Sequence, residues 1–336
     1  TCRNCESTCP SGVQYGRLVE IGRAVVDAQV ERTPRDKTTR WLLKEGLTSP
    51  LFKPAVKLGQ AVKSLLPPVL ATKLPAKAPP QAHDWPTRPH PRKVLLLTGC
   101  VQPALMPNIN SATARVLDAA GIQTLVADRA GCCGAMRTHL GDREGGLDDM
   151  RRNIDAWWAA LQTQSIEAIV MNASGCGTQV KEYAHALRHD PAYADKAQRI
   201  SELTRDLSEL LPDLVPKLKP RLRKLRDKTL AYHAPCTLQH GQQVRGLVET
   251  QLAELGFEIK VPVLESHLCC GSAGAYSVLH PDMAHTLRER KLSQLEPLHA
   301  QAIVSANIGC IQHLQAGTST PVKHWVEALD EALSRL

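Results

Sequence analysis

Gly131-Cys132-Cys133-Gly134 and Leu268-Cys269-Cys270-Gly271 contain the same tripeptide, Cys-Cys-Gly, at positions 137 residues apart. One cysteine precedes each pair of adjacent cysteines and another follows it, at nearly the same distances in both copies. Corresponding cysteines are separated by 134 to 137 residues, so eight of the 11 cysteines belong to a duplicated arrangement. The first cysteine set is Cys100, Cys132, Cys133 and Cys176, and the second cysteine set is Cys236, Cys269, Cys270 and Cys310.

Short apolar segments alternate with helical segments around both cysteine sets. The expected strands are residues 94–97, 122–127 and 168–171 in the first copy and 229–232, 257–261 and 302–305 in the second, with helices at 111–120, 146–161 and 244–255. Asn110 or Ser111 is the expected N-cap of the helix at 111–120, and Gly121 and Gly256 end corresponding helices. This order predicts an α/β fold of two sequence-related lobes with mainly parallel sheets, packed as a pseudo-twofold pair.

The outer cysteines of each set follow expected strands at the edge where open parallel sheets bind ligands. Adjacent cysteines on a regular strand would point to opposite faces, so each Cys-Cys-Gly needs a turn close to the site. Four thiolates in each lobe suit an iron–sulfur cluster or a tetrahedral zinc ion. A small buried apolar side chain is the ordinary interpretation of one cysteine, but two matched sets favour metal over that interpretation and over strained vicinal disulfides.

A third group of cysteines lies at the start of the chain, in Cys2-Arg3-Asn4-Cys5 followed by Cys9-Pro10. It matches the latter part of the bacterial ferredoxin run, in which the last cysteine binds the second cluster. Cys2 and Cys5 are thus the expected second and third ligands of one [4Fe-4S] cluster, and Cys9 is a ligand of another. The first ligand is expected just upstream of Thr1, so this segment alone should hold neither cluster stably. A zinc knuckle is the alternative.

The chain divides into four expected regions. Residues 1–32 form the C-terminal part of a two-cluster ferredoxin domain with a helix at 12–32, and residues 33–92 form a linker that holds 11 of the 23 prolines. Short helices at 41–47 and 55–66 and an extended stretch at 75–91 are expected in the linker. Residues 93–226 and 227–336 form the two cysteine-rich domains.

Composition narrows the class of protein. The chain has 43% hydrophobic and 22% charged residues and a net charge of +8. It contains no apolar run long enough for a membrane span and no secretion signal, which predicts a soluble, cytoplasmic protein in a reducing compartment. Much of the positive charge lies in residues 217–228, which lack the interleaved aromatic side chains of a nucleic-acid site and are expected to form a solvated connector. Contact with an acidic partner or anionic lipid stays open.

The chain resembles the iron–sulfur subunits of glycolate oxidase, also called glycolate dehydrogenase. The wider family includes the cysteine-rich subunit of heterodisulfide reductase and the iron–sulfur subunits of lactate utilisation and anaerobic glycerol-3-phosphate dehydrogenase. The resemblance covers essentially the whole chain. Its most discriminating stretches are residues 1–12, 130–135, 153–158, 173–177, 180–183, 236–240, 266–274 and 306–310.

The resemblance implies a subunit that passes electrons from a flavoprotein, which oxidises glycolate to glyoxylate, to a quinone-type acceptor. FAD is expected on partner subunits because this chain has no Gly-x-Gly-x-x-Gly after a strand. Two [4Fe-4S] clusters are implied for the ferredoxin domain, and further [4Fe-4S] clusters or zinc for the cysteine-rich lobes. Peripheral association with the cytoplasmic membrane face is compatible with the basic surface, and no nucleic-acid partner is expected.

One departure concerns the last cysteine of each set. Heterodisulfide reductase has a Cys-x-x-Cys pair there, which gives five thiols for an unusual cluster, whereas Gln179 and His313 stand at the second position here. A cubane cluster, a zinc ion in one lobe, or His313 as a mixed ligand are all open, and His313 is equally well explained as a surface or supporting histidine. His233, His240 and His267 are candidates for orienting ligands. A disulfide-reducing enzyme and a zinc-stabilised assembly module are alternative functions, and no catalytic residue is assigned.

Overall fold

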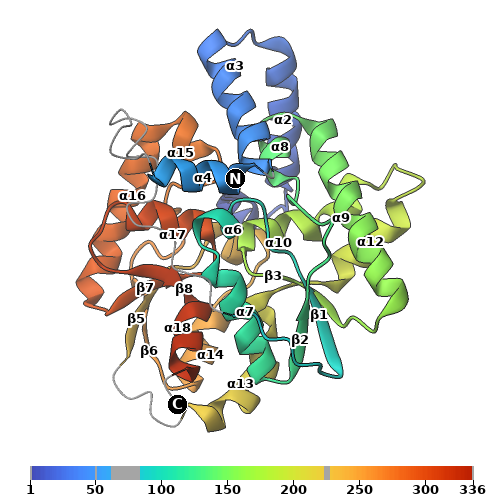
Figure 1. Cartoon of the computed structure of the whole chain (residues 1–336). Coiled ribbons are helices and arrows are strands. Elements are labelled where there is room, and N and C mark those ends of the chain that lie inside the picture. The colour runs from blue at the N-terminus through green and yellow to red at the C-terminus, as the bar shows by residue number, and fades with distance from the viewer. Residues whose placement is uncertain (1, 50, 62–83, 223–227, 335–336) are drawn as a thin grey trace.

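The computed structural model describes residues 2–49, 51–61, 84–222 and 228–334, and for residues 60 and 61 the backbone only. It contains two four-stranded sheets in which every strand pair is parallel. The strand orders are β2-β1-β3-β4 and β6-β5-β7-β8, which are the same order in the two halves of the chain. The predicted α/β fold with two related parallel lobes is therefore confirmed (Figure 1).

The strands are short, and the first three of each lobe coincide closely with the apolar segments of the sequence. They are β1 Arg92–Leu96, β2 Ile122–Leu125, β3 Ala168–Met171 and β4 Thr204–Asp206 in the first lobe, and β5 Thr229–Tyr232, β6 Glu258–Lys260, β7 Ala302–Ser305 and β8 Val322–His324 in the second. The fourth strand of each lobe was not predicted.

Helices cover both faces of each sheet. The first lobe has α6 Gln102–Leu105, α7 Asn108–Ala119, α8 Ala135–His139, α9 Arg143–Thr163, α10 Ser174–Lys181, α11 Tyr183–Ala186, α12 Ala194–Leu203, η3 Leu207–Leu210, α13 Leu211–Leu218 and η4 Lys219–Arg221. The second lobe has η5 Thr237–Gly241, α14 Leu247–Glu254, α15 Tyr276–Leu279, α16 Pro281–Leu295, η6 Glu296–Leu298, α17 Ile308–Gln315 and α18 Trp325–Leu333.

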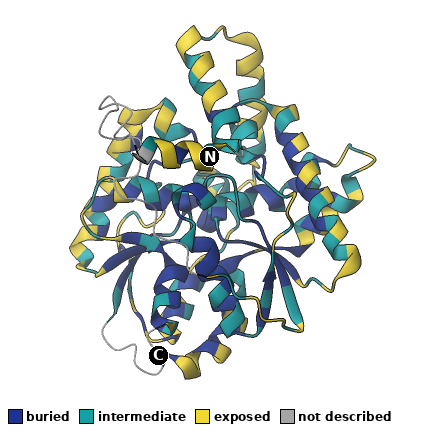
Figure 2. Cartoon of the chain, viewed as in Figure 1, coloured by how far each residue is buried: buried dark blue, intermediate teal, exposed yellow. Residues whose placement is uncertain are grey.

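Strand β1 shows how the sheet separates two cores. Val94 and Leu96 belong to a large buried cluster shared by both lobes, whereas Leu95 packs against α9 and α12 on the other face. Successive side chains of a strand point to opposite faces, so an uninterrupted apolar run suits a strand that is covered on both sides. Figure 2 shows the strands and the helices between the two sheets as the most deeply buried part of the molecule.

The two lobes are related by an approximate twofold exchange of elements. Helix α7, which follows β1, packs on α18, which follows β8; the equivalent pair is α14, which follows β5, and α13, which follows β4. Polar bonds join the first pair: Arg115 Nη2 lies 2.5 Å from Asp330 Oδ2, and Asn108 Nδ2 donates to Glu327 Oε1 at 2.9 Å. The predicted pseudo-twofold packing agrees with these contacts.

The N-terminal part consists of α1 Asn4–Thr8, α2 Tyr15–Gln29, α3 Pro34–Trp41, η1 Leu42–Gly46 and α4 Phe52–Ala61. Helices α2 and α3 project from the two lobes as a hairpin (Figure 1). The expected helix at 12–32 is thus shorter, and α3 was missed although Thr33 accepts a hydrogen bond from the Asp36 amide and Pro34 occupies the first turn, both of which are helix-start signals. None of the described helices is both long and apolar enough to span a bilayer.

Other expectations need correction or lie outside the described residues. Helix α7 begins at Asn108, after Pro107, so Asn110 and Ser111 lie inside the helix and neither is its N-cap; Asn110 donates to the Thr98 carbonyl at 3.0 Å. The basic stretch at 217–228 is only partly a solvated connector, since Leu218 and Leu222 are buried in the shared core. Residues 62–83 and 223–227 of the expected linker and connector are not described, and residues 84–91 have no helix or strand. The domain boundaries at 93–226 and 227–336 remain a prediction.

Candidate metal centres

Each cysteine set is assembled from three loops at the carboxyl edge of its sheet. In the first lobe Cys100 follows β1, Cys132 and Cys133 lie between β2 and α8, and Cys176 lies in the first turn of α10 after β3. Strands β2, β1 and β3 are neighbours, so their loops converge beside the switch between β1 and β3.

The second lobe repeats this placement. Cys236 lies at the start of η5 after β5, Cys269 and Cys270 precede α15, and Cys310 lies in the first turn of α17 after β7. The structure thus brings together the four cysteines of each predicted set.

The thiols of the first set influence one another's ionisation. Hydrogen bonding with Cys100 and then with Cys133 lowers the pKa of Cys132 to about 3, and the backbone amides of Gly134 and Met136 act in the same direction. The pKa of Cys133 is raised well above its ordinary value by hydrogen bonding with Cys132 and Cys176 and by burial. A thiolate at Cys132 is therefore favoured inside a cluster of thiols, and thiolates are what metal ions bind.

The second set shows the same electrostatic pattern. Hydrogen bonding with Cys236 and Cys270 lowers the pKa of Cys269 to about 2, and the Gly271 amide donates to Cys269 Sγ at 3.3 Å. The pKa of Cys310 is lowered to about 6, first by hydrogen bonding with Cys270 and also by His233. Both lobes are therefore suited to hold a cationic metal centre.

The glycine of each Cys-Cys-Gly is required by the backbone. Gly134 and Gly271 have φ angles of +87° and +91°, which disfavour any residue with a Cβ atom. A Cβ on Gly134 would also lie 2.7 Å from the Gly146 carbonyl oxygen, and one on Gly271 would clash with the Ala284 carbonyl oxygen. The turn expected from the sequence is therefore present in both lobes, with its glycine packed against the following long helix.

The Cys-Cys turn of the first lobe is held by two buried polar side chains. Asn153 Nδ2 on α9 donates to the Cys132 carbonyl at 2.7 Å, and the Tyr183 hydroxyl donates to the Cys133 carbonyl at 2.9 Å. Asn153 also donates to the Tyr183 hydroxyl at 3.1 Å, and the Tyr183 ring stacks on Trp157. These roles were not predicted, although Asn153 and Trp157 are four residues apart and therefore share one face of a helix.

The second lobe uses a buried cation and an imidazole where the first uses neutral amide and phenol groups. Lys291 on α16 is 1% exposed, and its Nζ donates to the Glu265 carbonyl at 2.7 Å beside the second cysteine set. His233 is 2% exposed, and one of its ring nitrogens lies within 4.8 Å of Cys270 Sγ and Cys310 Sγ, which are equally close to each other. Neither role was predicted beyond the suggestion that His233 orients a ligand.

His313 and His240 make other contacts. His313 Nε2 lies 3.0 Å from the Ala284 carbonyl oxygen, to which it donates, so that ring nitrogen has a backbone partner. His240 Nδ1 lies 2.8 Å from Ser7 Oγ, and its Nε2 lies 3.1 Å from the carbonyl oxygen of the exposed His267. These geometries favour supporting roles for His313 and His240 over metal binding.

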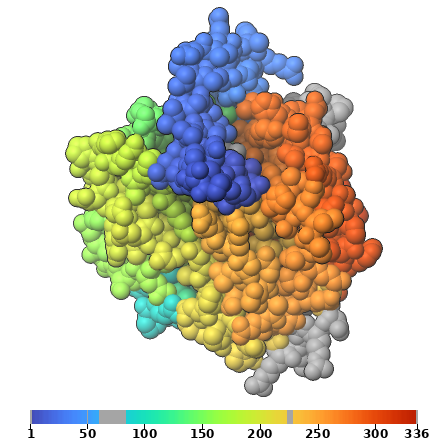
Figure 3. Space-filling model, turned by 180° about the vertical axis from the view of Figure 1, so that it is seen from behind, coloured from blue at the N-terminus to red at the C-terminus, as the bar shows by residue number. Residues whose placement is uncertain are grey.

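The third cysteine group sits over the junction of the two lobes, as the space-filling view in Figure 3 shows. On α1, Arg3 Nη2 is 3.1 Å from Glu182 Oε1 of the first lobe, whereas Ser7 contacts His240 of the second. Cys5 is exposed, and Cys9 ends α1. Hydrogen bonds from the Val13 and Ser11 amides lower the pKa of Cys9, which again favours a thiolate.

Helix α1 also brings the third cysteine group close to the second set. It packs against η5, which begins directly after Cys236. The pKa of Cys236 is raised well above its ordinary value by hydrogen bonding with Cys269 and by burial, and Cys2 adds to this electrostatically from outside the lobe. Cys2 is therefore an electrostatic neighbour of the second cysteine set.

The distances among donor atoms distinguish the two classes of metal centre. Ligands of one tetrahedral zinc ion lie about 2.3 Å from the metal and so about 3.8 Å from one another. Among the described residues, only His233, Cys270 and Cys310 form a group of three or more within 4.8 Å. The first set is instead connected by thiol–thiol hydrogen bonds from Cys100 to Cys132, from Cys132 to Cys133 and from Cys133 to Cys176.

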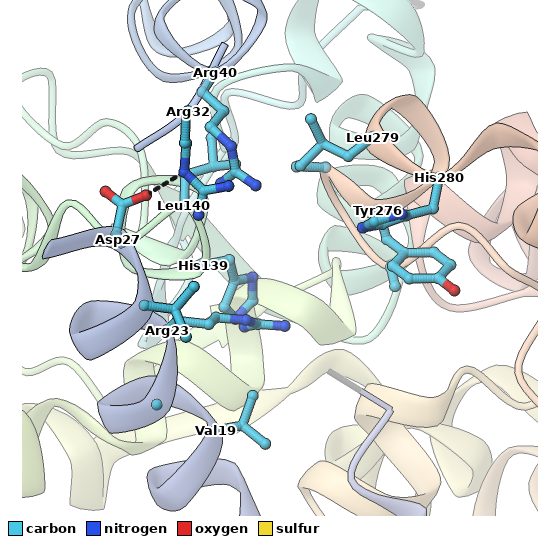
Figure 4. Close-up of a pocket in the computed structure, with 15 residues that line it drawn as sticks. Val19, Arg23, Asp27, Arg32, Arg40, His139, Leu140, Tyr276, Leu279 and His280 are labelled. Atoms are coloured by element: carbon cyan, nitrogen blue, oxygen red, sulfur yellow. Dashed lines mark hydrogen bonds and ion pairs between the residues drawn. The ribbon is translucent and has the colours of Figure 1, made fainter. Parts of the chain in front are cut away.

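A cavity of about 340 Å³ lies where α2, α8 and α15 meet (Figure 4). Arg32 Nε pairs with Asp27 Oδ1 at 2.7 Å, and Asp36 pairs with both Arg32 and Arg40. Arg23 Nη1 is buried without a hydrogen-bond partner among the described residues.

His139 also faces this cavity. Burial, and next the charge of Arg23, lower the pKa of His139 to about 3, so that its ring is neutral at physiological pH. The apolar part of the lining comes from Val19, Val26, Leu140, Ala275 and Leu279.

Comparisons with known proteins agree with this geometry. The family model "CCG: Cysteine-rich domain" matches residues 94–181 and 230–315. The glycolate oxidase iron-sulfur subunit of Escherichia coli K12 is 48% identical over 100% of this chain and 81% of that protein. The probable glycolate oxidase iron-sulfur subunit of Bacillus subtilis 168 is 26% identical over 94% of this chain and 76% of that protein.

A more distant relative is named for a different substrate. Lactate utilization protein A of Bacillus licheniformis is 26% identical over 66% of this chain and 90% of that protein. The resemblance inferred from the cysteine motifs and their flanks is thereby confirmed. The chain, which contains two CCG cysteine-rich domains, belongs to the family of glycolate oxidase iron-sulfur subunits.

Proposed function

We propose that this chain is the electron-transfer subunit of a glycolate-oxidising complex and that its 11 cysteines bind iron–sulfur clusters. The observation that carries the proposal is the placement of three cysteine groups: two at the carboxyl edges of the sheets and one within and on either side of α1, which contacts both lobes. Clusters held there would accept and release single electrons.

The start of each lobe supports an electron-carrying role over hydride chemistry. Strand β1 leads through Thr98 and Gly99 to Cys100, and β5 leads through His233 to Cys236. In nucleotide-binding sheets a glycine-rich phosphate loop occupies this position. The oxidation of glycolate to glyoxylate needs an organic cofactor, so we assign FAD to partner subunits.

The domain division follows the same proposal. Residues 1–32 form part of a ferredoxin domain whose clusters use Cys2, Cys5 and Cys9. Residues 33–92 connect it to the cysteine-rich domains at 93–226 and 227–336. The contact of α1 with η5 would place a ferredoxin cluster beside the second cysteine set.

The cavity beside α2 is the proposed place for a quinone-type acceptor. Its volume of about 340 Å³ lies within the range of small-molecule sites. Apolar side chains would contact the ring, while Arg23 and His139 would donate hydrogen bonds to its carbonyl oxygens. Two aspartates, Asp27 and Asp36, offset two of the three arginines, so about one positive charge remains to stabilise a ligand that gains electrons.

An acceptor of this kind connects the protein with a membrane. We propose a cytoplasmic location with peripheral association at the cytoplasmic membrane face, which the net charge of +8 supports through attraction to anionic lipids.

Substitution Arg23→Leu tests the acceptor site. It should raise the KM for a short-chain quinone without changing glycolate-dependent reduction of a soluble dye, whereas Arg35→Leu on the exposed side of α3 should change neither.

The main test is reduction by substrate. The complex, purified anaerobically with its flavoprotein subunits, should show EPR signals of reduced iron–sulfur clusters within seconds of adding glycolate. Omission of the flavoprotein should abolish the signals, and dithionite should still produce them. Clusters that dithionite reduces but glycolate does not would refute the proposed role, and one zinc with no sulfide per lobe would establish an assembly module instead.

A further inference from the structure

We propose that His233 is a metal ligand in the second lobe, so that the two lobes hold chemically different centres: thiolate ligands in the first and mixed imidazole and thiolate ligands in the second. This inference rests on the proposed metal-binding role of the cysteines. It adds a fifth donor at a position separate from the one at which heterodisulfide reductase has its additional cysteine.

The backbone holds His233 at one place. Its amide donates to the Val304 carbonyl at 2.9 Å, which continues the pairing of β5 with β7 by one residue. The Ser305 hydroxyl donates to the His233 carbonyl at 2.9 Å. The ring therefore projects from a strand end that is fixed on two sides, next to the site.

The imidazole is buried and incompletely paired. His233 is 2% exposed, and Nε2 has no hydrogen-bond partner among the described residues. Buried polar nitrogens in folded proteins nearly always have a partner, and an orphan calls for an explanation such as a bound ion. One ring nitrogen lies within 4.8 Å of both Cys270 Sγ and Cys310 Sγ, which is the grouping that a bound metal would use.

The first lobe shows which residue occupies the position equivalent to His233 when no additional ligand is needed. The Leu97 amide donates to the Val170 carbonyl at 3.2 Å, just as the His233 amide donates to Val304, so the two residues are structural equivalents. Leu97 is 3% exposed and packs in the apolar core with Cys133. An ordinary core position in this fold therefore takes leucine, and the second lobe places an imidazole there, a ligand suited to both iron and zinc.

His313 offers the internal comparison. Its sequence position left a role as a mixed ligand open, and its Nε2 donates to the Ala284 carbonyl. Lys291 does not compete for the site because it is a donor only and points to the Glu265 carbonyl. Of these three side chains, His233 is the one that places a ring nitrogen within 4.8 Å of two of the sulfur atoms.

The test measures nitrogen bound to the paramagnetic centre. The full-length protein, labelled with ¹⁵N-histidine or unlabelled, is purified anaerobically, reduced with dithionite and examined by pulsed EPR. We expect a strongly coupled histidine nitrogen in the wild type, its loss in His233→Leu, which copies Leu97, and its retention in His313→Leu. Metal and sulfide analysis of each variant records whether the centre is still present, and His233→Cys should keep it with sulfur ligands only.

The outcomes are separable from those for the proposed function. A second-lobe centre with no coupled histidine nitrogen, or with a coupling that survives His233→Leu, would overturn this inference even if glycolate reduces the clusters. If the second lobe contains zinc, X-ray absorption at the zinc edge must show a nitrogen ligand that His233→Leu removes; an all-sulfur shell would equally overturn it. Failure of glycolate to reduce the clusters would leave the nitrogen measurement unaffected.

Discussion

Replacing Tyr183 by phenylalanine removes one hydroxyl from the support of the first Cys-Cys turn and leaves the stacked ring in place. That hydroxyl donates to the Cys133 carbonyl at 2.9 Å and accepts from Asn153 at 3.1 Å. A buried polar group left without its partner costs about 1–3 kcal/mol. Asn153 keeps its second hydrogen bond, to the Cys132 carbonyl, so we expect a total loss of about 2 kcal/mol in the free energy of unfolding.

Such a loss should lower the melting temperature by roughly 4–8 °C. The local effect should be larger than the global one, because the Cys133 carbonyl belongs to the turn that presents two thiols. Anaerobic melting curves would measure the first effect, and the rate of iron transfer to a chelator at constant temperature would measure the second. Tyr193→Phe is the matched control, because its hydroxyl bonds Asp155 at 2.8 Å on the surface, away from both cysteine sets. Equal iron release from the two variants would refute the assigned role of Tyr183.

Three further perturbations test other parts of the structure. Gly134→Ala should lower the free energy of unfolding in urea by about 1 kcal/mol more than Gly121→Ala does. Both glycines have a positive φ, but only at Gly134 would the added Cβ lie 2.7 Å from a carbonyl oxygen. Equal losses of unfolding free energy in the two variants would contradict the packing argument. Lys291→Met should lower the reduction potential of the second-lobe centre by roughly 50–100 mV in a redox titration, because a buried ammonium at an effective dielectric constant of 20 contributes about 2 kcal/mol. The control variant Lys323→Met should leave this potential unchanged. An unchanged potential in Lys291→Met would be inconsistent with the assigned geometry. Burial alone would raise the pKa of Asp118, but His90 and Arg88 hold it below its usual value, so the carboxylate adds stability that is present above about pH 4 and is lost as pH falls through the folded pKa. Asp118→Asn should therefore be less stable than the wild type by about 1 kcal/mol at pH 7, with the difference vanishing in acid melting curves, and a difference that persists at pH 2 would show another cause.

The sequence predicted the central strands because those strands are apolar on both faces. β3, β5 and β7 have the predicted bounds, and the duplicated cysteines identified the loops at their ends. The fourth strands escaped prediction because β4 is Thr-Arg-Asp and β8 is Val-Lys-His. Polar side chains at the ends of these strands cap the helices that follow: Asp206 Oδ1 accepts from the Ser208 amide at 3.0 Å, and His324 Nδ1 accepts from the Val326 amide at 3.1 Å. Such edge strands carry no hydrophobic periodicity.

The candidate site also has a part that the sequence predicted and a part that it did not. Cysteine spacing was enough to gather the donor atoms, because the ends of parallel strands are fixed by strand order. Which histidine reaches the sulfur atoms depends on helix packing and on the direction of each ring, neither of which a spacing encodes. His313 follows Cys310 by three residues yet bonds Ala284, whereas His233 precedes Cys236 by three residues and lies beside Cys310. The packing of α17 on α16 directs His313 to the Ala284 carbonyl, and His233 is the histidine that lies beside the sulfur atoms.

The two lobes therefore share the backbone conformation of the Cys-Cys turn and differ in the charge of the side chains around it. Both use a glycine with positive φ to press a Cys-Cys turn against a long helix, and both stabilise a thiolate within four gathered sulfurs. Around the first set, the groups that hold the turn are a neutral amide and a neutral phenol, and the buried Asp149 is an electrostatic neighbour of Cys132. Around the second set, the buried groups are an ammonium and an imidazole. A positive charge stabilises the electron-rich state of a nearby centre, so the second lobe should be the easier one to reduce. Helix α1 lies against η5 of that same lobe, so the third cysteine group would adjoin the centre that is easier to reduce. The proposed electron transfer would then run between the third cysteine group and the second lobe.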